Sequence, residues 1–409
     1  MVFSNHTRMV VGVTAAALAI AGLAGCTAPA TPGGDATEFT LWDPYPQFDE
    51  TSAWSTTLDA CAAELDVKLT REGMDTSALT SKLLLAASAD NAPDIAIIDN
   101  PLVASIAETG LLSNVADLGL DTSEILPNLL AAGTVDGVAY GVPLGSNTLA
   151  LYYNKAILAE VGIEPPTNWE ELKSDVAAVQ AAGHQGIGFS AVGTEEGSFQ
   201  FLPFFWGAGA DLSDLDSPEA VEALTLWTNF VTSGGASASV LNSTQADIND
   251  QFLAGDLAFQ VNGSWQLAGL DAGDVDYGIV PIPAVDGGDA AAPLGGEFLT
   301  VPVSDDADRL AVAADLVACI TEPENALEWA KGLTYILPTA DVQAQQAEES
   351  EAIAAFVDAV AAAKGRTSDL GTDYPRVSEQ LWTAMQEALS GAKSPEQALT
   401  DAQAAVDAG

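Results

Sequence analysis

The chain has 409 residues, which is too long for one ordinary hydrophobic core and long enough for two lobes of typical domain size. Its formal net charge is −46, with 12 Lys and Arg against 58 Asp and Glu, so too few cations are present to displace phosphate counterions and nucleic acid is excluded as a partner. The same balance argues against an anionic ligand. The simplest interpretation is a solvated acidic surface that keeps a monomer soluble; a salty habitat or a partner with a basic docking face is the alternative.

The N-terminal segment has the layout of a secretory signal. Arg8 precedes an apolar run over residues 10–23, which is shorter than a membrane span needs. The run ends in the letters LAGC, which resemble the bacterial lipobox, where small residues precede a Cys that is lipidated. We therefore expect residues 1–25 to be a signal peptide, Cys26 to carry the lipid, and residues 26–37 to form the lipidated N-terminus and a flexible Pro/Gly-rich linker.

After the linker the pattern alternates short strands with helices. Strands are expected at residues 39–42, 67–69 and 93–99, with amphipathic helices between them. A second unit begins with a strand at residues 149–153, and further strands are expected at 187–190, 258–261 and 277–282. From Pro338 onward the chain is almost wholly helical and Ala-rich. This alternation predicts an α/β fold with a mostly parallel sheet.

A series of short motifs carries a family resemblance. Their order and spacing, together with the lipobox, resemble the family 1 extracellular solute-binding proteins, the group that contains maltose-binding protein. The motifs are GVP at 141–143, LALYYNK at 149–155, PPTNWEEL at 165–172, QFLAGDLAF at 251–259, NGSW at 262–265, VPIP at 280–283, GG at 295–296 and LPT at 337–339.

The resemblance implies a two-lobe periplasmic-binding-protein-like fold with a hinge that the chain crosses three times and an Ala-rich helical C-terminus. The crossings would fall near residues 146–148, 282–285 and 334–337. The N-terminal lobe would hold residues 38–146 and 284–334, and the C-terminal lobe residues 147–283 and 335–409. A ligand would bind between the lobes, which would close over it.

The implied function is that of the substrate-binding lipoprotein of an ABC importer. Such a protein captures a neutral sugar or short oligosaccharide and delivers it to the transmembrane subunits of a permease. It would be a monomer on the outer face of the cytoplasmic membrane, held by the lipid on Cys26, without cofactor or metal. G-x-S-x-G, H-E-x-x-H and P-loop motifs are absent from the sequence, so an enzyme is not expected. The alternatives are a receptor for a cationic solute such as a polyamine, an exported glycoside hydrolase or a surface adhesin.

A sugar offers flat apolar faces and hydroxyl edges, so its site needs aromatic rings and fixed polar groups. Trp265 follows Asn262-Gly263-Ser264 just after a strand, at the edge where open α/β sheets bind ligands. In this family an aromatic residue commonly stacks on the ligand at that motif. Trp42 and Asp43 close the first strand in the same way, and Tyr45 follows them in a loop.

Further candidates lie at strand ends and at the implied crossings. Asp99 and Asn100 end the strand before a helix, which they could instead cap. Asn147 lies at the first crossing, and Glu297 follows Gly295-Gly296. Trp206 belongs to an apolar run that must be mostly core. The last two candidates lie where related proteins often add a ligand contact: Tyr374 and Arg376.

The two remaining cysteines are expected in the same lobe. Cys61 shares a helix face with Trp54, Leu58 and Leu65, and Cys319 lies on a helix expected from about residue 306 to 320. By the family's chain path both helices cover the first lobe. The pair is either a disulfide, which an oxidising compartment would preserve, or two buried free thiols, and free thiols are the preferred interpretation.

Overall fold

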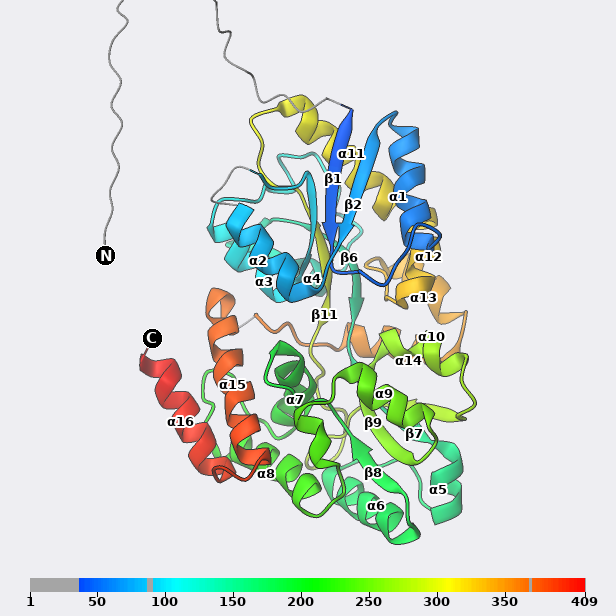
Figure 1. The fold of residues 1–409 in the computed structure, drawn as a ribbon, viewed down its shortest axis with the longest axis vertical. Helices are drawn as coiled ribbons and strands as arrows, with labels where there is room; N and C mark the ends of the chain where they lie inside the picture. The colour runs from blue at the N-terminus through cyan, green and yellow to red at the C-terminus, as the bar shows by residue number, and fades with distance from the viewer. Residues whose placement is uncertain (1–36, 87–90, 368–369, 409) are drawn as a thin grey trace, which may run out of the picture. The chain divides into compact units, whose positions relative to one another are not determined.

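Two β-sheets, each flanked by helices, make up the computed structural model of this protein, which describes residues 37–86, 91–367 and 370–408 (Figure 1). The predicted signal peptide, Cys26 and nearly all of the predicted linker lie outside the described residues. We call the sheet of β2, β1, β3, β11 and β6 with its helices the first lobe, and the sheet of β10, β7, β9 and β8 with its helices the second lobe. The predicted two-lobe α/β fold is confirmed, but the prediction of a mostly parallel sheet is wrong, because β11 and β7 each pair antiparallel with both of their neighbours.

The last strand of the first lobe in chain order, β11, lies between two earlier strands, β3 and β6. The strand order is β2-β1-β3-β11-β6, with β1 parallel to β2 and β3, and β11 antiparallel to both of its neighbours. The strands are β1 Glu38–Asp43, β2 Lys68–Gly73, β3 Ile95–Asp99, β6 Val142–Asn147 and β11 Gly295–Thr300. The helices are α1 Ala53–Glu64, α2 Thr76–Ala86, α3 Asn100–Glu108, α11 Ala307–Thr321 and α12 Pro323–Leu333; α4 Pro127–Ala131 and the small pair β4 Thr134–Val135 and β5 Val138–Ala139 follow α3.

The second lobe is built on a mixed sheet of order β10-β7-β9-β8. Its strands are β7 Leu149–Asn154, β8 Gln185–Gly188, β9 Leu257–Gly263 and β10 Tyr277–Val280. Its helices are α5 Lys155–Val161, α6 Trp169–Ala182, α7 Glu195–Gly207, α8 Pro218–Thr232, α9 Gln245–Leu253 and α10 Leu267–Asp271, with one-turn 3₁₀ helices at Ala238–Leu241 and Ser264–Gln266. The helical C-terminus holds α13 Ala340–Ala347, α14 Glu351–Ala361, a 3₁₀ turn at Gly371–Asp373, α15 Tyr374–Leu389 and α16 Pro395–Ala408.

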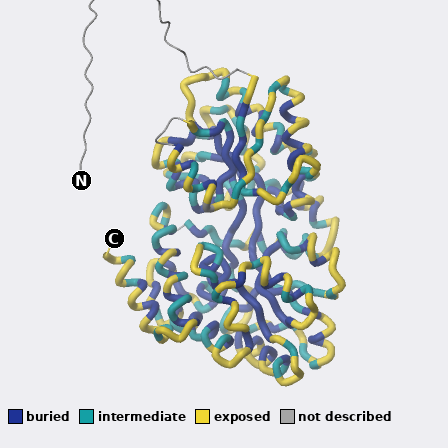
Figure 2. Tube along the Cα trace, viewed as in Figure 1, coloured by how far each residue is buried: buried dark blue, intermediate teal, exposed yellow. Residues whose placement is uncertain are grey.

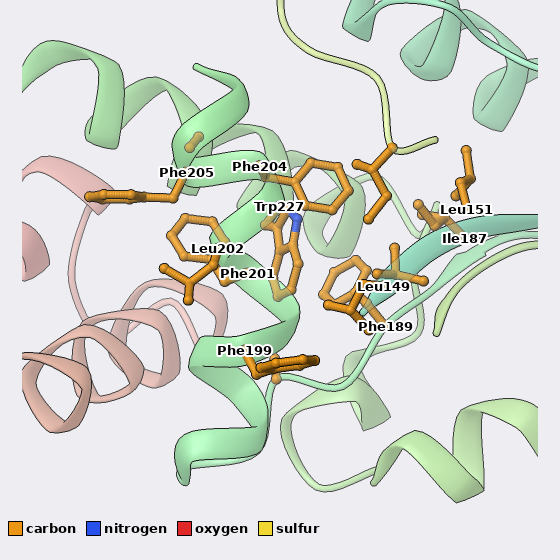
Figure 3. Close-up of a cluster of buried hydrophobic side chains, with 14 of the residues drawn as sticks. Leu149, Leu151, Ile187, Phe189, Phe199, Phe201, Leu202, Phe204, Phe205 and Trp227 are labelled. Atoms are coloured by element: carbon orange, nitrogen blue, oxygen red, sulfur yellow. The ribbon is translucent and has the colours of Figure 1, made fainter. Parts of the chain in front are cut away.

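Aromatic packing fills the core of the second lobe (Figure 3). Phe201, Phe204 and Phe205 lie on α7 and are fully buried, together with Trp227 of α8. The indole of Trp227 stacks on Phe189 at 3.9 Å between ring centroids and meets the edges of Phe201 and Phe204. Because large apolar side chains on this scale dominate core energetics, α7 is held firmly against the sheet. In Figure 2 the inner strands of both sheets are buried, whereas the edge strands β2 and β10 are exposed or half-buried and the outer faces of the helices are exposed.

A disulfide joins two helices of the first lobe. Cys61 of α1 and Cys319 of α11 are bonded, with their Cα atoms 5.8 Å apart. The two residues share one lobe, as predicted, but the preferred interpretation of two free thiols is wrong. The bond forms because α1 and α11 pack side by side on the same core, which brings Cys61 and Cys319 within bonding reach.

Hydrogen-bonded backbone segments connect the two lobes. Ser146 of β6 exchanges two backbone hydrogen bonds with Ile336, each 2.8 Å long, and Gly296 of β11 pairs with Ser146 from the other side. A Cβ on Gly296, whose φ is +109°, would lie 2.1 Å from the carbonyl oxygen of Gly145. Glycine is therefore required for the close approach of β11 and β6 at this point.

Two crossings differ from the predicted ones. The chain stays in the second lobe through Leu294, because residues 282–290 fold back and Val285 donates to the carbonyl of Gly207 at 3.0 Å. The second crossing is therefore at Leu294–Gly295 rather than 282–285. Val342 of α13 packs in the first-lobe core, whereas Phe356 of α14 packs in the second, so residues 335–347 lie mainly with the first lobe and the transfer comes after α13.

Candidate ligand-binding site

A carboxylate on the first lobe faces the junction between the two sheets. Glu297 of β11 lies beside Asp99, the last residue of β3, in the register of the two strands. The hydroxyl groups of Tyr45 and Tyr335 both donate to Glu297 Oε2, that of Tyr45 at 3.3 Å. Loss of solvation and the neighbouring charge of Asp99 raise the pKa of Glu297 to about 7, although the two tyrosine hydrogen bonds oppose this. Glu297 can thus change its charge near neutral pH.

Arg366 connects residues from both lobes. This side chain is 3% exposed and lies in the loop between α14 and α15. Its guanidinium donates to Asp99 at 2.9 Å and to Asn100 Oδ1 at 3.1 Å in the first lobe, and to Glu195 of α7 at 2.7 Å in the second. Burial lowers the pKa of Arg366, but the charges of Asp99 and Glu195 outweigh it and the pKa is raised, so the guanidinium stays charged.

Glu195 is held from within the second lobe. It lies in the first turn of α7, where a negative charge is favoured by the exposed N–H groups of the helix. The hydroxyl of Tyr374 donates to Glu195 Oε1 at 2.6 Å, and the hydroxyl of Ser378 donates to Oε2. Burial, followed by the charge of Glu195, raises the pKa of Tyr374 well above its ordinary value, so this phenol remains a donor.

An aromatic pair borders these charged groups. The rings of Phe199 and Trp265 lie 6.2 Å apart at 48°, and the guanidinium of Arg366 lies 4.8 Å from the centre of the Phe199 ring. Trp265 is partly exposed, and a Cβ on Gly263 would lie 2.1 Å from its indole, so the glycine allows the ring to fold back over the end of β9. Such a ring can offer an apolar face to a ligand.

We call these residues the junction cluster. Seven of the eleven predicted site residues fall in it. Asn147 belongs to it because it pairs with Gly295 in the register of β6 and β11, and Tyr45 because it donates a hydrogen bond to Glu297. The cluster comprises Tyr45, Asp99, Asn100, Asn147, Glu195, Phe199, Trp265, Glu297, Tyr335, Arg366 and Tyr374.

Four predicted site residues lie elsewhere. Asp43 is fully buried and forms an ion pair with Arg71 at 2.5 Å, so the prediction of a ligand contact is corrected to a structural role. Arg376 binds the carbonyl of Val406 and Asp373, which ties α15 to α16. Trp42 is 8% exposed, under the ammonium of Lys82, and Trp206 packs against the second-lobe core beside Lys364.

Four members of the cluster were missed from the sequence: Glu195, Phe199, Tyr335 and Arg366. One feature of the sequence could have pointed to Arg366. The chain has only 12 Lys and Arg, and a rare cation in an acidic protein is worth testing as a site residue. Glu195 and Phe199 begin an otherwise apolar helix. Tyr335 precedes the LPT motif, and its neighbour Gly145 leaves room for the ring, since a Cβ there would lie 2.6 Å from it.

Two surface pockets lie outside this cluster. A pocket of about 430 Å³ on the second lobe is lined by residues including Tyr153, Asp271 and Tyr277, and one of about 530 Å³ on the first lobe by residues including Leu112 and Tyr140. Neither lining includes a member of the junction cluster. Within the described ranges, no group of three or more His, Cys, Asp or Glu side chains is placed to hold a metal ion. None of the helices described is long and apolar enough to span a membrane.

Two α/β lobes joined by paired crossings, with polar and aromatic side chains gathered where the sheets meet, define a protein of the periplasmic-binding-protein fold. The family model described as bacterial extracellular solute-binding protein matches residues 56–357, and this chain belongs to that family.

The relatives named here are 27–30% identical to this chain over the aligned residues. The maltodextrin-binding protein of Bacillus subtilis is 30% identical over 226 residues, which cover 52% of this chain and 53% of the relative. The sn-glycerol-3-phosphate-binding periplasmic protein of Salmonella typhimurium is 27% identical over 242 residues, 54% of each chain. The chain spans about half the length of the curated relatives it matches. The structure of the cyclic alpha-maltosyl-1,6-maltose binding protein of Arthrobacter globiformis is 27% identical, with a TM-score of 0.74 over 91% of this chain and 98% of that chain.

Proposed function

We propose that this protein is the substrate-binding lipoprotein of an ABC importer and that it captures a neutral sugar or short oligosaccharide between its lobes for delivery to a membrane permease. The observation that carries the proposal is the junction cluster. It sets hydrogen-bonding carboxylates and a guanidinium beside the rings of Phe199 and Trp265. Relatives that bind maltodextrin and a cyclic maltosyl-maltose support the same ligand class.

The chemistry of the cluster suits a sugar. A pyranose ring presents an apolar face, which can lie against the partly exposed indole of Trp265. Its hydroxyl groups both donate and accept, so they can pair with the carboxylates of Glu297 and Asp99 and with tyrosine hydroxyls. Closure of the lobes would remove water from both kinds of contact. In this proposal the protein binds its ligand and returns it unchanged, as a receptor rather than as an enzyme.

We further propose that the mature chain begins at a lipidated Cys26 and is held on the outer face of the cytoplasmic membrane as a monomer. The LAGC sequence after an apolar run supports this. Several acyl chains on one Cys would anchor the protein firmly, because a single chain binds a membrane only marginally. The variant Cys26→Ala should appear in the soluble fraction; if it stays tightly bound to membranes, the anchor lies elsewhere.

A cationic solute such as a polyamine is the second candidate, favoured by one observation. The cluster contains three carboxylates, Asp99, Glu195 and Glu297, and the single guanidinium of Arg366 pairs with two of them. Carboxylates next to aromatic rings also suit ammonium groups. The same charges disfavour a phosphate ligand like that named for the Salmonella relative.

Isothermal titration calorimetry of the purified mature protein with maltose, maltotriose, maltotetraose and spermidine would test these candidates. Saturable binding of a maltosaccharide, and its recovery intact after incubation, supports the sugar receptor. Binding of spermidine alone would replace it with the cation receptor, and shortening of the oligosaccharide would indicate a hydrolase. If none of these compounds binds, the proposed ligand class is wrong.

A further inference from the structure

Arg366 makes a direct polar connection between the lobes. One of its nitrogens donates to Asp99 and Asn100, at the end of β3 in the first lobe. Another donates to Glu195, in the first turn of α7 in the second lobe. Both ion pairs are short, at 2.9 and 2.7 Å, and the guanidinium is 3% exposed. These bonds use only the protein's own groups.

The position of Arg366 is fixed by the backbone around it. Two residues earlier, Lys364 pairs with the segment before β11, donating to Ala292 and accepting from Leu294 at 2.9 and 2.8 Å. The Nε of Arg366 also donates to the carbonyl of Leu294, and its guanidinium lies over Phe199. Arg366 therefore reaches both carboxylates from a backbone position that is held beside the crossing into β11. Ion pairs between long exposed side chains contribute little to stability, but Arg366 is not exposed in that way.

Separation of the lobes at this point would leave a charge without its partner. If the second lobe moves away from the first and the loop that carries Arg366 stays behind, Glu195 loses its contact with Arg366. If that loop moves with the second lobe, Asp99 loses the contact instead. A buried charge pair that loses one side is penalised much more than an exposed one, because the remaining ion is poorly solvated. The contacts thus favour the arrangement in which the two sheets face each other across the junction cluster.

We infer that Arg366 is a tie between the lobes that operates without ligand and raises ligand affinity by populating the closed arrangement in advance. This rests on the proposed function, since it takes the junction cluster as the ligand site. A ligand binds with an apparent affinity reduced by the fraction of molecules that are not in the competent state. Arg366 is accordingly a positioning residue, which acts on affinity through Asp99 and Glu195.

The test compares three variants with the wild-type protein. Arg366→Gln removes the tie, and Glu195→Gln removes the negative charge at its second-lobe end while keeping one side-chain oxygen as an acceptor. Arg309→Gln is the matched control, because Arg309 forms an ion pair with Asp94 entirely within the first lobe. The radius of gyration of each protein without ligand is measured by small-angle X-ray scattering, and maltotriose affinity by calorimetry.

We expect Arg366→Gln and Glu195→Gln to have larger radii of gyration without ligand than the wild type and Arg309→Gln, and to bind maltotriose about fivefold more weakly or worse. Radii equal to that of Arg309→Gln would overturn the inference. If Arg366→Gln does not fold, Glu195→Gln decides alone by the same criterion. If maltotriose binds to none of the proteins, the proposed function fails for this ligand, while the scattering of the ligand-free proteins still decides whether the tie exists.

Discussion

Replacement of Glu297 by Gln should change how stability depends on pH. Burial and the charge of Asp99 raise the pKa of this carboxyl from 4.5 to about 7. Between these two pH values the folded protein keeps a proton that the unfolded chain has lost, so the contribution of Glu297 to stability falls as pH rises. The full difference between the two pKa values corresponds to about 3 kcal/mol, and partial solvent access reduces it, so we expect about 1–3 kcal/mol.

Gln has nearly the shape of a protonated Glu and carries no charge. Glu297→Gln should therefore match the wild type near pH 4 and exceed its free energy of unfolding by about 1–3 kcal/mol near pH 8. Urea denaturation followed by tryptophan fluorescence at intervals from about pH 4 to 8 measures this difference. Glu124, which is exposed, is replaced by Gln as the control for the loss of one carboxylate. A pH-independent difference for Glu297→Gln, or a less stable variant at pH 8, would refute the reasoning.

Three further predictions concern other parts of the molecule. Trp265→Ala should weaken ligand binding at least about tenfold by calorimetry with the fold retained, whereas Trp206→Ala, outside the junction cluster, should change it less than about twofold. Replacing both Cys61 and Cys319 by Ala should lower the free energy of unfolding by about 2–4 kcal/mol, and an unchanged urea midpoint would contradict this. Gly296→Ala should cost about 1–3 kcal/mol from strain at its φ of +109°, and more because the new Cβ would lie 2.1 Å from the carbonyl oxygen of Gly145. It should therefore destabilise the protein more than Gly287→Ala, where φ is +99° and a Cβ would lie 3.7 Å from its nearest atom.

Strand ends were the part of the site that sequence could locate. Asp99 ends and Trp265 follows a strand recognisable from its apolar pattern, and ligands bind at such edges in α/β folds. Glu297 was located differently, from the Gly295-Gly296 motif before it, because no strand was predicted there. Asp43 satisfies the same rule, but in the structure it is fully buried in an ion pair. Its partner, Arg71, lies on the parallel neighbour β2, and which strands pair was not evident from their order in the chain.

Arg366 and Glu195 could not be predicted as site residues from the sequence, for a different reason. Neither belongs to a motif or a periodic pattern, and they are 171 residues apart in the sequence. Their contact depends on where the chain crosses between the lobes, and two of the three crossings were misplaced because a turn and a short helix lie against the less expected lobe. Local propensity determines which elements form, whereas these contacts depend on tertiary packing.

The position of β11 also bears on how the chain is made. Gly295–Thr300 lies between β3 and β6, so the first sheet lacks its central connection until about three hundred residues have left the ribosome. Closing such a long loop costs chain entropy before any contact repays it, and folds dominated by distant pairings form slowly. The first lobe of a nascent chain therefore cannot complete its sheet before β11 has been made. That delay suits a polypeptide whose first residues are predicted to direct it across a membrane, because a chain that has not completed its fold can still cross in extended form.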